Sequence, residues 1–452
     1  MQSISALRAA KRRRPILAAF AVLLCGLGSA AVIAAETNAP LAFPDAQGWA
    51  AHTAGGRGGK ILRVTTLAAD GPGSFVEAVN SKGPRIVVFE VGGVIDLGVK
   101  TVKISEPYLT IAGQTAPQPG ITLIRGGLDI FAHDVIVQHL RVRPGDAGLP
   151  KMSGNDFDSI STVGAHDVIV DHCSLTWATD ENLSASGTRF KGDTPEQWRE
   201  GTSHRITFSN NIIAEGLANA NHAKGEHSKG SLIHDNARDI LIVGNLYAQN
   251  YERNPFFKGG TQGWVVNNLI YNPGQRGVMY NLIAAEWLGH PYQTGQMAVV
   301  GNVMRAGPNT PTTSAFFMFG GSGELDLYLH DNIAVDRIGN PLPMQGRYTT
   351  AAVAPRMMKD APMLPFGVKP MPASDVQDAV IANVGARPWD RDDIDRRILE
   401  NTIEGRGHIL DSQDEVGGYP KHAQTRQAFV PSDWNLDTME PLQPLQRRDP
   451  LK

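Results

Sequence analysis

The chain has 452 residues, of which 42% are hydrophobic and 19% charged, enough for one large core or two smaller ones. Its 48 glycines and 7% aromatic content favour short strands and frequent turns over long helices. The formal net charge is −3, and it becomes −8 if the first 35 residues, which carry five basic and no acidic residues, are removed. An acidic chain of this kind is a poor candidate for general nucleic-acid binding.

Residues 1–35 have the pattern of a secretory signal peptide. Arg8 and the basic run 11–14 precede the apolar stretch "PILAAFAVLLCGLGSAAVIAA", and the alanines before Glu36 suit signal peptidase. A membrane anchor is the alternative, because roughly 20 apolar residues can span a bilayer. We expect cleavage and a secreted or periplasmic bacterial protein without stable membrane association. Cys173 then remains alone, so the fold contains no internal disulfide.

A short helix is predicted early in the chain, within "GSFVEAVN" at residues 73–80. Ser74 and Glu77 have the spacing of a capping box at its start.

The middle of the chain repeats one strand motif seven times. "DVIVQHLRVR" at 134–143 is followed by "DVIVDHCSLT" at 167–176, and similar segments begin at residues 205, 239, 263, 297 and 326. Strands that recur every 20–40 residues without helices between them indicate stacked coils with a continuous core. A propeller needs four strands per repeat, and an immunoglobulin-like sandwich does not repeat one motif. The pattern predicts an all-β, right-handed parallel β-helix over residues 36–340, with the helix at 73–80 capping its N-terminal end.

One position of the repeat is occupied by asparagine in five successive coils. Asparagine tolerates left-handed backbone, and its amide can hydrogen-bond to the coil above or below. The sequence therefore predicts a structural ladder formed by Asn211, Asn245, Asn268, Asn302 and Asn332.

Beyond residue 340 the repeats give way to proline-rich sequence. One amphipathic helix is predicted at 392–405, with Ile394, Ile398 and Ile403 on one face. We expect residues 341–452 to form a C-terminal extension packed along the β-helix rather than an independent domain.

The coil at 154–184 is rich in acid. Asp156 and Asp158 are two apart and face the same side of a strand, and Asp180 and Glu181 follow the next strand of that coil. Carboxylates without cysteine or histidine ligands suit Ca²⁺, although a solvated acidic loop is the simpler alternative. Within the same coil lies the Asp171–His172 pair, one member of which is expected to point into the core.

Cations follow in the next coils, at Lys229 in "HSKGSLI" and at Arg253 and Lys258 in "YERNPFFKGG". Equivalent positions in stacked coils lie about 5 Å apart, so these cations could flank the same groove as the carboxylates. A groove with a metal-bound edge and a basic edge suits a polyanionic chain such as a polyuronate.

Over roughly residues 125–280 the sequence resembles the pectate lyase family, the first family of polysaccharide lyases. "RNPFFKGG" is similar to the family's Arg-x-Pro-x-x-Arg/Lys-Gly-Gly element, "HSKGSLI" to its substrate-lysine segment, and "NDFDSI…VIVDHCSLTW" to its calcium-binding segment. The resemblance implies calcium ligands at Asp156, Asp158 and Asp180. The family's second acidic pair is four residues apart, but Ser184 stands at its last position, so Glu181 is the expected substitute.

The resemblance also implies Ca²⁺-assisted β-elimination on polygalacturonate or a related polyuronate. We expect the enzyme to be a monomer. Arg253 would be the catalytic base, and Lys229 and Lys258 would bind substrate. Because free arginine has a pKa above about 12, this role requires burial or neighbouring cations that favour the neutral form. Stabilisation of the developing anion is the more cautious role for Arg253.

Two other functions stay open at this point. A β-helix glycoside hydrolase could use Asp156 with Asp158 or Asp180 as acid and base, but it would leave the cations unexplained. A non-catalytic polysaccharide-binding β-helix would not require the acidic coil and the cations to share one groove.

Overall fold

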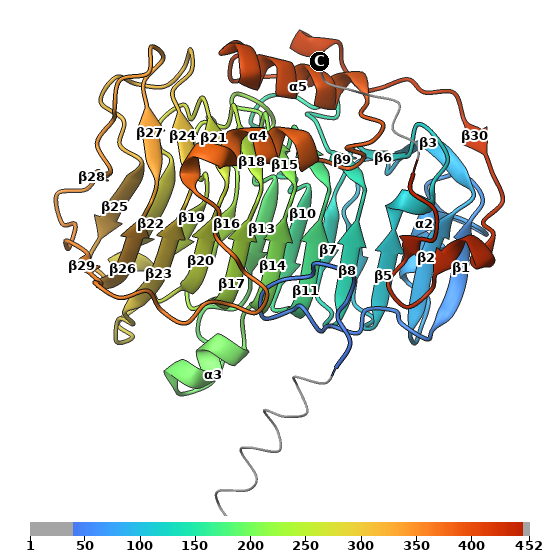
Figure 1. Cartoon of the computed structure of the whole chain (residues 1–452), viewed down its shortest axis with the longest axis horizontal. Helices are drawn as coiled ribbons and strands as arrows, with labels where there is room; N and C mark the ends of the chain where they lie inside the picture. Colours follow the sequence, from blue (N-terminus) through green and yellow to red (C-terminus); the bar gives the residue numbers. More distant parts are fainter. Residues whose placement is uncertain (1–38, 446–452) are drawn as a thin grey trace, which may run out of the picture. The chain divides into compact units, whose positions relative to one another are not determined.

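The computed structural model describes residues 39–445, so the segment predicted as a signal peptide lies outside the described residues. Within the described residues, 41–445 belong to one compact unit. Within the described residues no helix is long and apolar enough to cross a membrane. Most of the unit is built from three sheets whose strands alternate along the chain, so each complete coil contributes one strand to each sheet (Figure 1). A separate two-stranded sheet is formed by β31 (Trp434–Asn435) and β32 (Glu440–Pro441).

The first sheet contains the strand that opens most of the sequence repeats. Each strand pairs in parallel with the equivalent strand of the next coil, for example Val168 with Ile206. In order, its strands are β1 (Lys60–Val64), β2 (Arg85–Phe89), β5 (Leu109–Ala112), β8 (Val135–Gln138), β11 (His166–Asp171), β14 (His204–Ser209), β17 (Arg238–Val243), β20 (Gln262–Val266), β23 (Gly295–Val300), β26 (Leu325–His330) and β29 (Arg356–Met357).

The second sheet carries the strands that follow the acidic and basic segments, and its pairs are also parallel. In chain order its strands are β4 (Val102–Ile104), β7 (Leu128–Ile130), β10 (Ile160–Val163), β13 (Leu183–Ser186), β16 (Leu232–Ile233), β19 (Phe256–Lys258), β22 (Val278–Leu282), β25 (Phe317–Gly321) and β28 (Gln345–Arg347).

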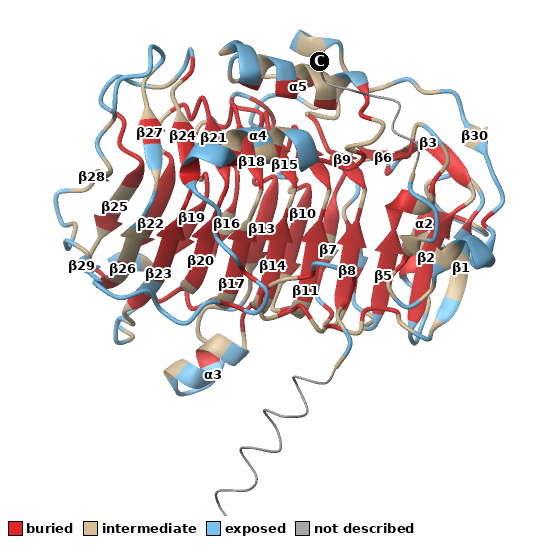
Figure 2. Cartoon of the chain, viewed as in Figure 1, coloured by how far each residue is buried: buried red, intermediate tan, exposed pale blue. Residues whose placement is uncertain are grey.

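The third sheet holds the second short strand of each repeat. Its parallel strands are β3 (Val91–Asp96), β6 (Ile121–Ile124), β9 (Arg141–Arg143), β12 (Ser174–Thr176), β15 (Ile212–Ala214), β18 (Leu246–Ala248), β21 (Leu269–Tyr271), β24 (Val303–Arg305) and β27 (Ile333–Val335), and β30 (Thr425–Arg426) joins β3 antiparallel. The inward side chains of all three sheets form one continuous core, and most strands are buried along their length (Figure 2). The predicted parallel β-helix is confirmed.

The short helix α2 (Phe75–Val79) closes the N-terminal end of the core. Phe75, Ala78 and Val79 are buried in the core cluster, next to β1 and β2. Ser74 caps the helix by accepting from the Glu77 N–H (3.2 Å), as predicted. The Glu77 carboxylate accepts from the Gly73 N–H (2.6 Å), one residue before the N-cap, so the reciprocal half of the capping box is shifted by one position.

The asparagine ladder is confirmed at the corner between the first and third sheets. The side-chain amide of Asn245 donates to Oδ1 of Asn268 (3.0 Å), and Asn268 donates in turn to Asn302 (2.9 Å). Each Oδ1 also accepts the backbone N–H of the preceding rung, for example Asn245 N–H to Asn268 at 2.9 Å. Each side-chain amide thereby hydrogen-bonds to backbone groups that, at this corner, are not paired with a neighbouring strand.

Replacing Asn268 with alanine should lower the free energy of unfolding by about 2 kcal/mol or more, because the buried amide groups of two neighbouring rungs lose partners. The matched variant is Asn332→Ala, at the partly exposed last rung, which should cost about half as much or less. Urea denaturation of both variants measures the difference, and equal losses would show that depth in the ladder is irrelevant.

The C-terminal region covers the outer face of the third sheet with α4 (Ala373–Asn383) and α5 (Asp393–Glu404). Val376, Val380 and Ile398 pack with outward residues of β15, β18, β21 and β24 in a second buried cluster. The helix predicted at 392–405 is confirmed, with Asp392 as N-cap and Gly405 as left-handed C-cap. Ile398 is buried but Ile403 is 43% exposed, so the prediction that the two share one face of the helix with Ile394 is wrong for Ile403. The boundary at residue 340 between the β-helix and the C-terminal extension stays a prediction.

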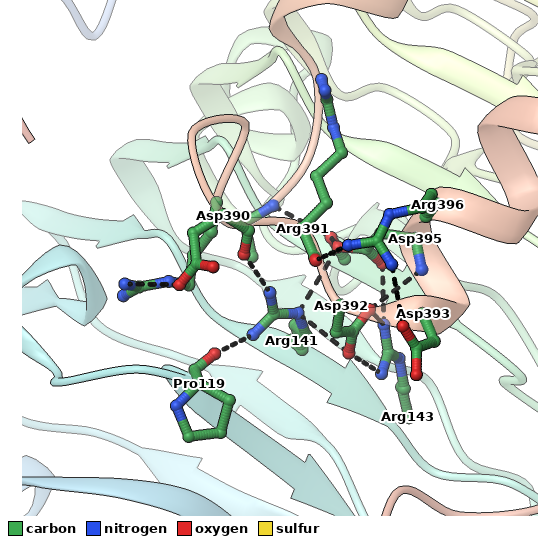
Figure 3. A network of polar contacts seen from close by, with 12 residues as sticks. Pro119, Arg141, Arg143, Asp390, Arg391, Asp392, Asp393, Asp395 and Arg396 are labelled. Carbon is green, nitrogen blue, oxygen red and sulfur yellow. Dashed lines mark hydrogen bonds and ion pairs between the residues drawn. The ribbon is translucent and has the colours of Figure 1, made fainter. Parts of the chain in front are cut away.

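A buried ionic network fixes α5 to the β-helix (Figure 3). Arg143 on β9 donates to Asp392 (2.6 and 3.1 Å) and to Asp395 (2.7 Å). Arg141 lies beside the same two carboxylates, at 3.2 and 3.4 Å. Ser174 on β12 donates to Asp395 (2.7 Å). Four buried charges from distant parts of the sequence are thus paired with one another.

Candidate active site

The predicted site residues lie where the chain enters strands of the second sheet. Asp156 and Asp158 precede β10, and Asp180 and Glu181 precede β13. Lys229 precedes β16 in the next coil, and Glu181 and Lys229 form a parallel bridge. Parallel pairing therefore stacks these entry segments on neighbouring coils, about 5 Å apart.

Three of the four predicted metal ligands come together. Asp158, Asp180 and Glu181 each offer a carboxylate oxygen within 4.8 Å of the other two. The Glu181 N–H donates to Oδ1 of Asp158 (2.9 Å), which fixes the spacing of the two entry segments. The three residues line a cavity of about 410 Å³, and Ser184 lies on its wall.

The acidic group is electrostatically crowded. Burial and the neighbouring charges of Asp180 and Asp129 raise the pKa of Asp158 well above its usual range. Asp129 belongs to β7, directly opposite Ser161 in the sheet register. A divalent cation would stabilise the ionised form of a carboxylate whose pKa is raised in this way.

Two histidines that the sequence reasoning missed hold Asp180. Nε2 of His227 lies 2.7 Å from Oδ1 of Asp180, and Nε2 of His222 lies 3.7 Å from Oδ2. The Lys224 N–H donates to Nδ1 of His222 (3.1 Å), so the proton of the neutral ring is on Nε2. The two rings stack with centroids 3.6 Å apart. Their position just ahead of Lys229 was the available sequence signal.

Asp156 lies outside the group of three carboxylates. Its Oδ1 accepts from the Ala223 N–H (3.1 Å), and its Oδ2 is 3.7 Å from Nε2 of His222. It therefore contacts the 222–227 segment rather than Asp158 or Glu181.

Arg253 reaches back across the coils to the acidic group, where it forms an ion pair with Glu181. Its backbone is left-handed, with φ of 64°, a conformation that costs energy in a non-glycine residue and is frequent at functional sites. Burial lowers the pKa of Arg253, while the charges of Asp180 and Asp158 oppose that shift. Burial thus favours the neutral form, whereas the nearest charges do not.

The two lysines are also paired with protein carboxylates. Lys229 lies 2.6 Å from Glu252, which also pairs with Arg276. Lys258, at the end of β19, lies 3.2 Å from Asp235 and pairs with Glu286. The sequence analysis did not predict these acids as partners of the lysines. They lie in three different turns, which come close to the lysines only when the coils stack in the folded chain. A polyanionic substrate would have to compete with them.

No family model matches the chain. It is 33% identical over 390 residues to a probable pectate lyase C of Emericella nidulans, covering 85% of this chain and 81% of the relative. It is 36% identical over 280 residues to a probable pectate lyase C of Aspergillus terreus, covering 62% of this chain and 58% of the relative. Both relatives are fungal, which gives no support to the predicted bacterial source.

Among solved structures, the chain is similar to the cedar pollen allergen jun a 1, with a TM-score of 0.52 and 15% identity. The match covers 75% of this chain and 92% of the allergen. At this identity the similarity concerns the fold alone.

Proposed function

The chain belongs to the pectate lyase family, and from that premise we propose that it cleaves polygalacturonate or a related polyuronate by Ca²⁺-assisted β-elimination. The observation that carries the proposal is the meeting of Asp158, Asp180 and Glu181 with Arg253 at one edge of the second sheet. A hydrolase would need two carboxylates but would have no use for the adjoining cations. We further propose that the enzyme is secreted after removal of residues 1–35 and acts as a monomer.

The site suits a calcium ion. Asp158, Asp180 and Glu181 supply the oxygen ligands that Ca²⁺ prefers, and a cation among them would offset the burial and the repulsion by neighbouring carboxylates that raise the pKa of Asp158. His222 and His227 would orient Asp180, as partners of a ligating carboxylate do. When bound, calcium would neutralise the substrate carboxylate and make the proton at C5 more acidic.

Arg253 would take the C5 proton or stabilise the anion that forms there. In the described structure its guanidinium is paired with Glu181, which is also a candidate ligand. If Glu181 bound the metal ion instead of Arg253, the Arg253 guanidinium would be free to contact the substrate. The C5–H bond then breaks and its electron pair forms a double bond between C4 and C5. The bond from C4 to the glycosidic oxygen breaks, and the leaving oxygen takes up a proton from water.

Lys229 and Lys258 would hold carboxylates of neighbouring sugar units. Each lysine is buried and pairs with a protein acid in the described structure. Substrate uronates would replace Glu252 and Glu286 as partners.

Removing calcium should stop the reaction. The ultraviolet absorbance of polygalacturonate should rise with the purified chain and Ca²⁺, because elimination creates a conjugated double bond, and it should stop rising on addition of chelator. New reducing ends without absorbance would instead indicate a hydrolase.

Asp158→Asn should raise the calcium concentration for half-maximal rate by about tenfold or more, whereas Asp156→Asn should change it less. Equal shifts would contradict the ligand set proposed here.

A further inference from the structure

The groove that holds the three carboxylates has a second end, which is basic. The cavity of about 410 Å³ begins at Asp158 and Glu181, which precede β10 and β13. It ends at Thr188 and His234, just past the ends of β13 and β16. The residue after Thr188 is Arg189, a cation to which the proposed mechanism assigns no role.

Arg189 and Lys258 meet the same two carboxylate oxygens. Oδ2 of Asp235 accepts from Nε of Arg189 (2.9 Å) and lies 3.2 Å from Nζ of Lys258. Oε2 of Glu286 accepts from Nη2 of Arg189 (2.9 Å) and also pairs with Lys258. Nη2 of Arg189 lies 3.4 Å from Nε2 of His234, which lines the cavity. The two cations are therefore close enough to hold one carboxylate between them.

The strand register places this pair of cations beside the floor of the groove. Ile233 pairs with Phe257 in the parallel second sheet. His234 and Lys258 follow these two residues, so they stand side by side on neighbouring coils, about 5 Å apart. A substrate chain that reaches His234 at the end of the groove is then within one coil of Lys258.

The two acids of this cluster differ in how firmly they are held. Asp235 is fully buried, and its Oδ1 accepts from the Gly259 N–H (3.1 Å) and from the indole N–H of Trp287 (2.9 Å). It is a fixed counter-charge for one cation. Glu286 ends the short helix η2 (Ala284–Glu286), and its side chain is 35% exposed. Turning that carboxylate into solvent would leave two cations with one acid, which is a site for an anion.

A purely structural role, joining the loop at 187–200 to the loop at 283–293, is the alternative for these ion pairs. Aromatic packing already joins the two loops. Phe190 packs edge-on against Trp198 and Trp287, with ring centroids 5.1 and 5.3 Å away, and both tryptophans are buried in one cluster. A partly exposed ion pair adds little stability to loops that are held in this way.

The larger cavity of the chain, about 740 Å³ at the corner where β8 and β11 lead into β9 and β12, is unsuited to a uronate. Its ionisable lining residues are Asp45, His139, Asp171, His172 and Glu440. The expectation that Asp171 or His172 points into the core is wrong, because both line this cavity and Cys173 enters the core instead. No described lysine or arginine lines it, so its acids would repel a polyuronate.

We propose that Arg189 is a further substrate-binding residue, which together with Lys258 clamps the free carboxylate of one uronate unit in place of Glu286. The inference rests on the proposed polyuronate substrate and adds a requirement to it. The unit at this end of the groove must carry an ionised carboxylate, because a methyl ester has no charge and accepts weaker hydrogen bonds from the two cations. Glu286 competes for the same cations and so lowers the affinity for substrate.

The test is calorimetric titration of trigalacturonate into the full chain in the presence of chelator, which prevents calcium-dependent cleavage. Arg189→Ala should weaken binding by about tenfold or more, because charge-assisted hydrogen bonds to the carboxylate are lost. The fully methyl-esterified trimer should bind the wild type and Arg189→Ala equally weakly. Arg63→Ala is the control: it removes a cation paired with Glu90 on β1, at the N-terminal end of the first sheet, and should leave binding unchanged.

Glu286→Gln distinguishes a substrate clamp from a structural ion pair. It should tighten trigalacturonate binding by about threefold or more, because the competing carboxylate is gone. The gain should vanish in Arg189→Ala/Glu286→Gln. A structural ion pair predicts no gain in affinity.

Wild-type affinity in Arg189→Ala, no gain in Glu286→Gln, or no binding of trigalacturonate by the wild type would each overturn the proposal. Should Arg189→Ala fail to fold, Glu286→Gln decides, because it keeps the buried Asp235 paired with both cations. Tighter binding then supports the clamp, and unchanged affinity rejects it. The absorbance assay with Ca²⁺ tests the proposed elimination separately: binding without a rise in absorbance would refute elimination and leave the carboxylate site in place.

Discussion

Replacing Arg253 with alanine should lower kcat for polygalacturonate cleavage by about 10³-fold or more. The guanidinium is the group placed to act on the C5 proton or on the anion left behind, and losing a base or an oxyanion partner typically costs about 10²–10⁴-fold. Burial lowers the pKa of Arg253, so its neutral form is more accessible than that of a free arginine. Because the neutral fraction of a base grows with pH, wild-type turnover should rise toward alkaline pH. Absorbance assays across pH measure both effects.

Two further variants separate the loss of a catalytic group from the loss of a positive charge. Arg276→Ala removes a neighbouring arginine that is equally exposed, at 19%, and pairs with Glu252 rather than Glu181. It should reduce turnover far less than Arg253→Ala. Arg253→Lys keeps a cation but changes its reach and geometry, so it should restore binding without restoring full turnover.

Melting with and without Ca²⁺ completes the comparison. Arg253→Ala leaves Glu181 without its cation among two other carboxylates, so the metal-free variant should lose stability. Saturating calcium should remove most of that loss. Wild-type turnover in Arg253→Ala would end the assignment of a catalytic role to this residue.

The sequence predicted those features that each coil encodes by itself. The strand triplets and the asparagines recur in one place of every repeat, and stacking converts that repetition into three sheets and a ladder. The order of Asp158, Asp180, Lys229 and Arg253 along the chain could likewise be read as a stack of neighbouring entry segments. Their convergence follows from parallel pairing of successive coils.

The partners of those residues could not be predicted in the same way. Glu252 and Glu286 meet Lys229 and Lys258 through irregular turns whose lengths differ from coil to coil. His222 and His227 reach Asp180 from a loop without a repeat pattern. Turn conformation depends on tertiary packing, so charge pairs made by turns are decided only in the folded chain.

One long-range pairing links Arg143 to Asp392 and Asp395, about 250 residues further along, and neither side carries a sequence signal for the other. In the sequence, "RVR" is a strand with two arginines, and the aspartates belong to the capped start of a helix. Only the docking of α5 on the third sheet explains why two arginines on one strand are buried (Figure 3).

Replacing Asp392 with alanine should therefore lower the free energy of unfolding by about 3–5 kcal/mol. The variant leaves the buried Arg141 and Arg143 with fewer partners, and it also removes the N-cap of α5, whose side chain accepts from the Asp395 N–H (2.9 Å). The matched control is Asp393→Ala, one residue along in the same helix turn, whose side chain is 98% exposed in its pair with Arg396. That change should cost about 0.5 kcal/mol or less. Equal losses in urea denaturation would show that the buried network contributes nothing beyond the surface pair.

The same network predicts how stability depends on pH. Although burial opposes it, the charges of Arg141 and Arg143 hold the pKa of Asp392 well below its usual range. A carboxyl whose pKa is lower in the folded than in the unfolded state stabilises the fold above its unfolded pKa, about 3.9, and loses that contribution as pH falls toward the folded pKa. The free energy of unfolding of the wild type should therefore fall below about pH 4 more steeply than that of Asp392→Ala, so the two curves converge in acid. Parallel curves over this range would mean that Asp392 is not the group whose protonation loosens α5.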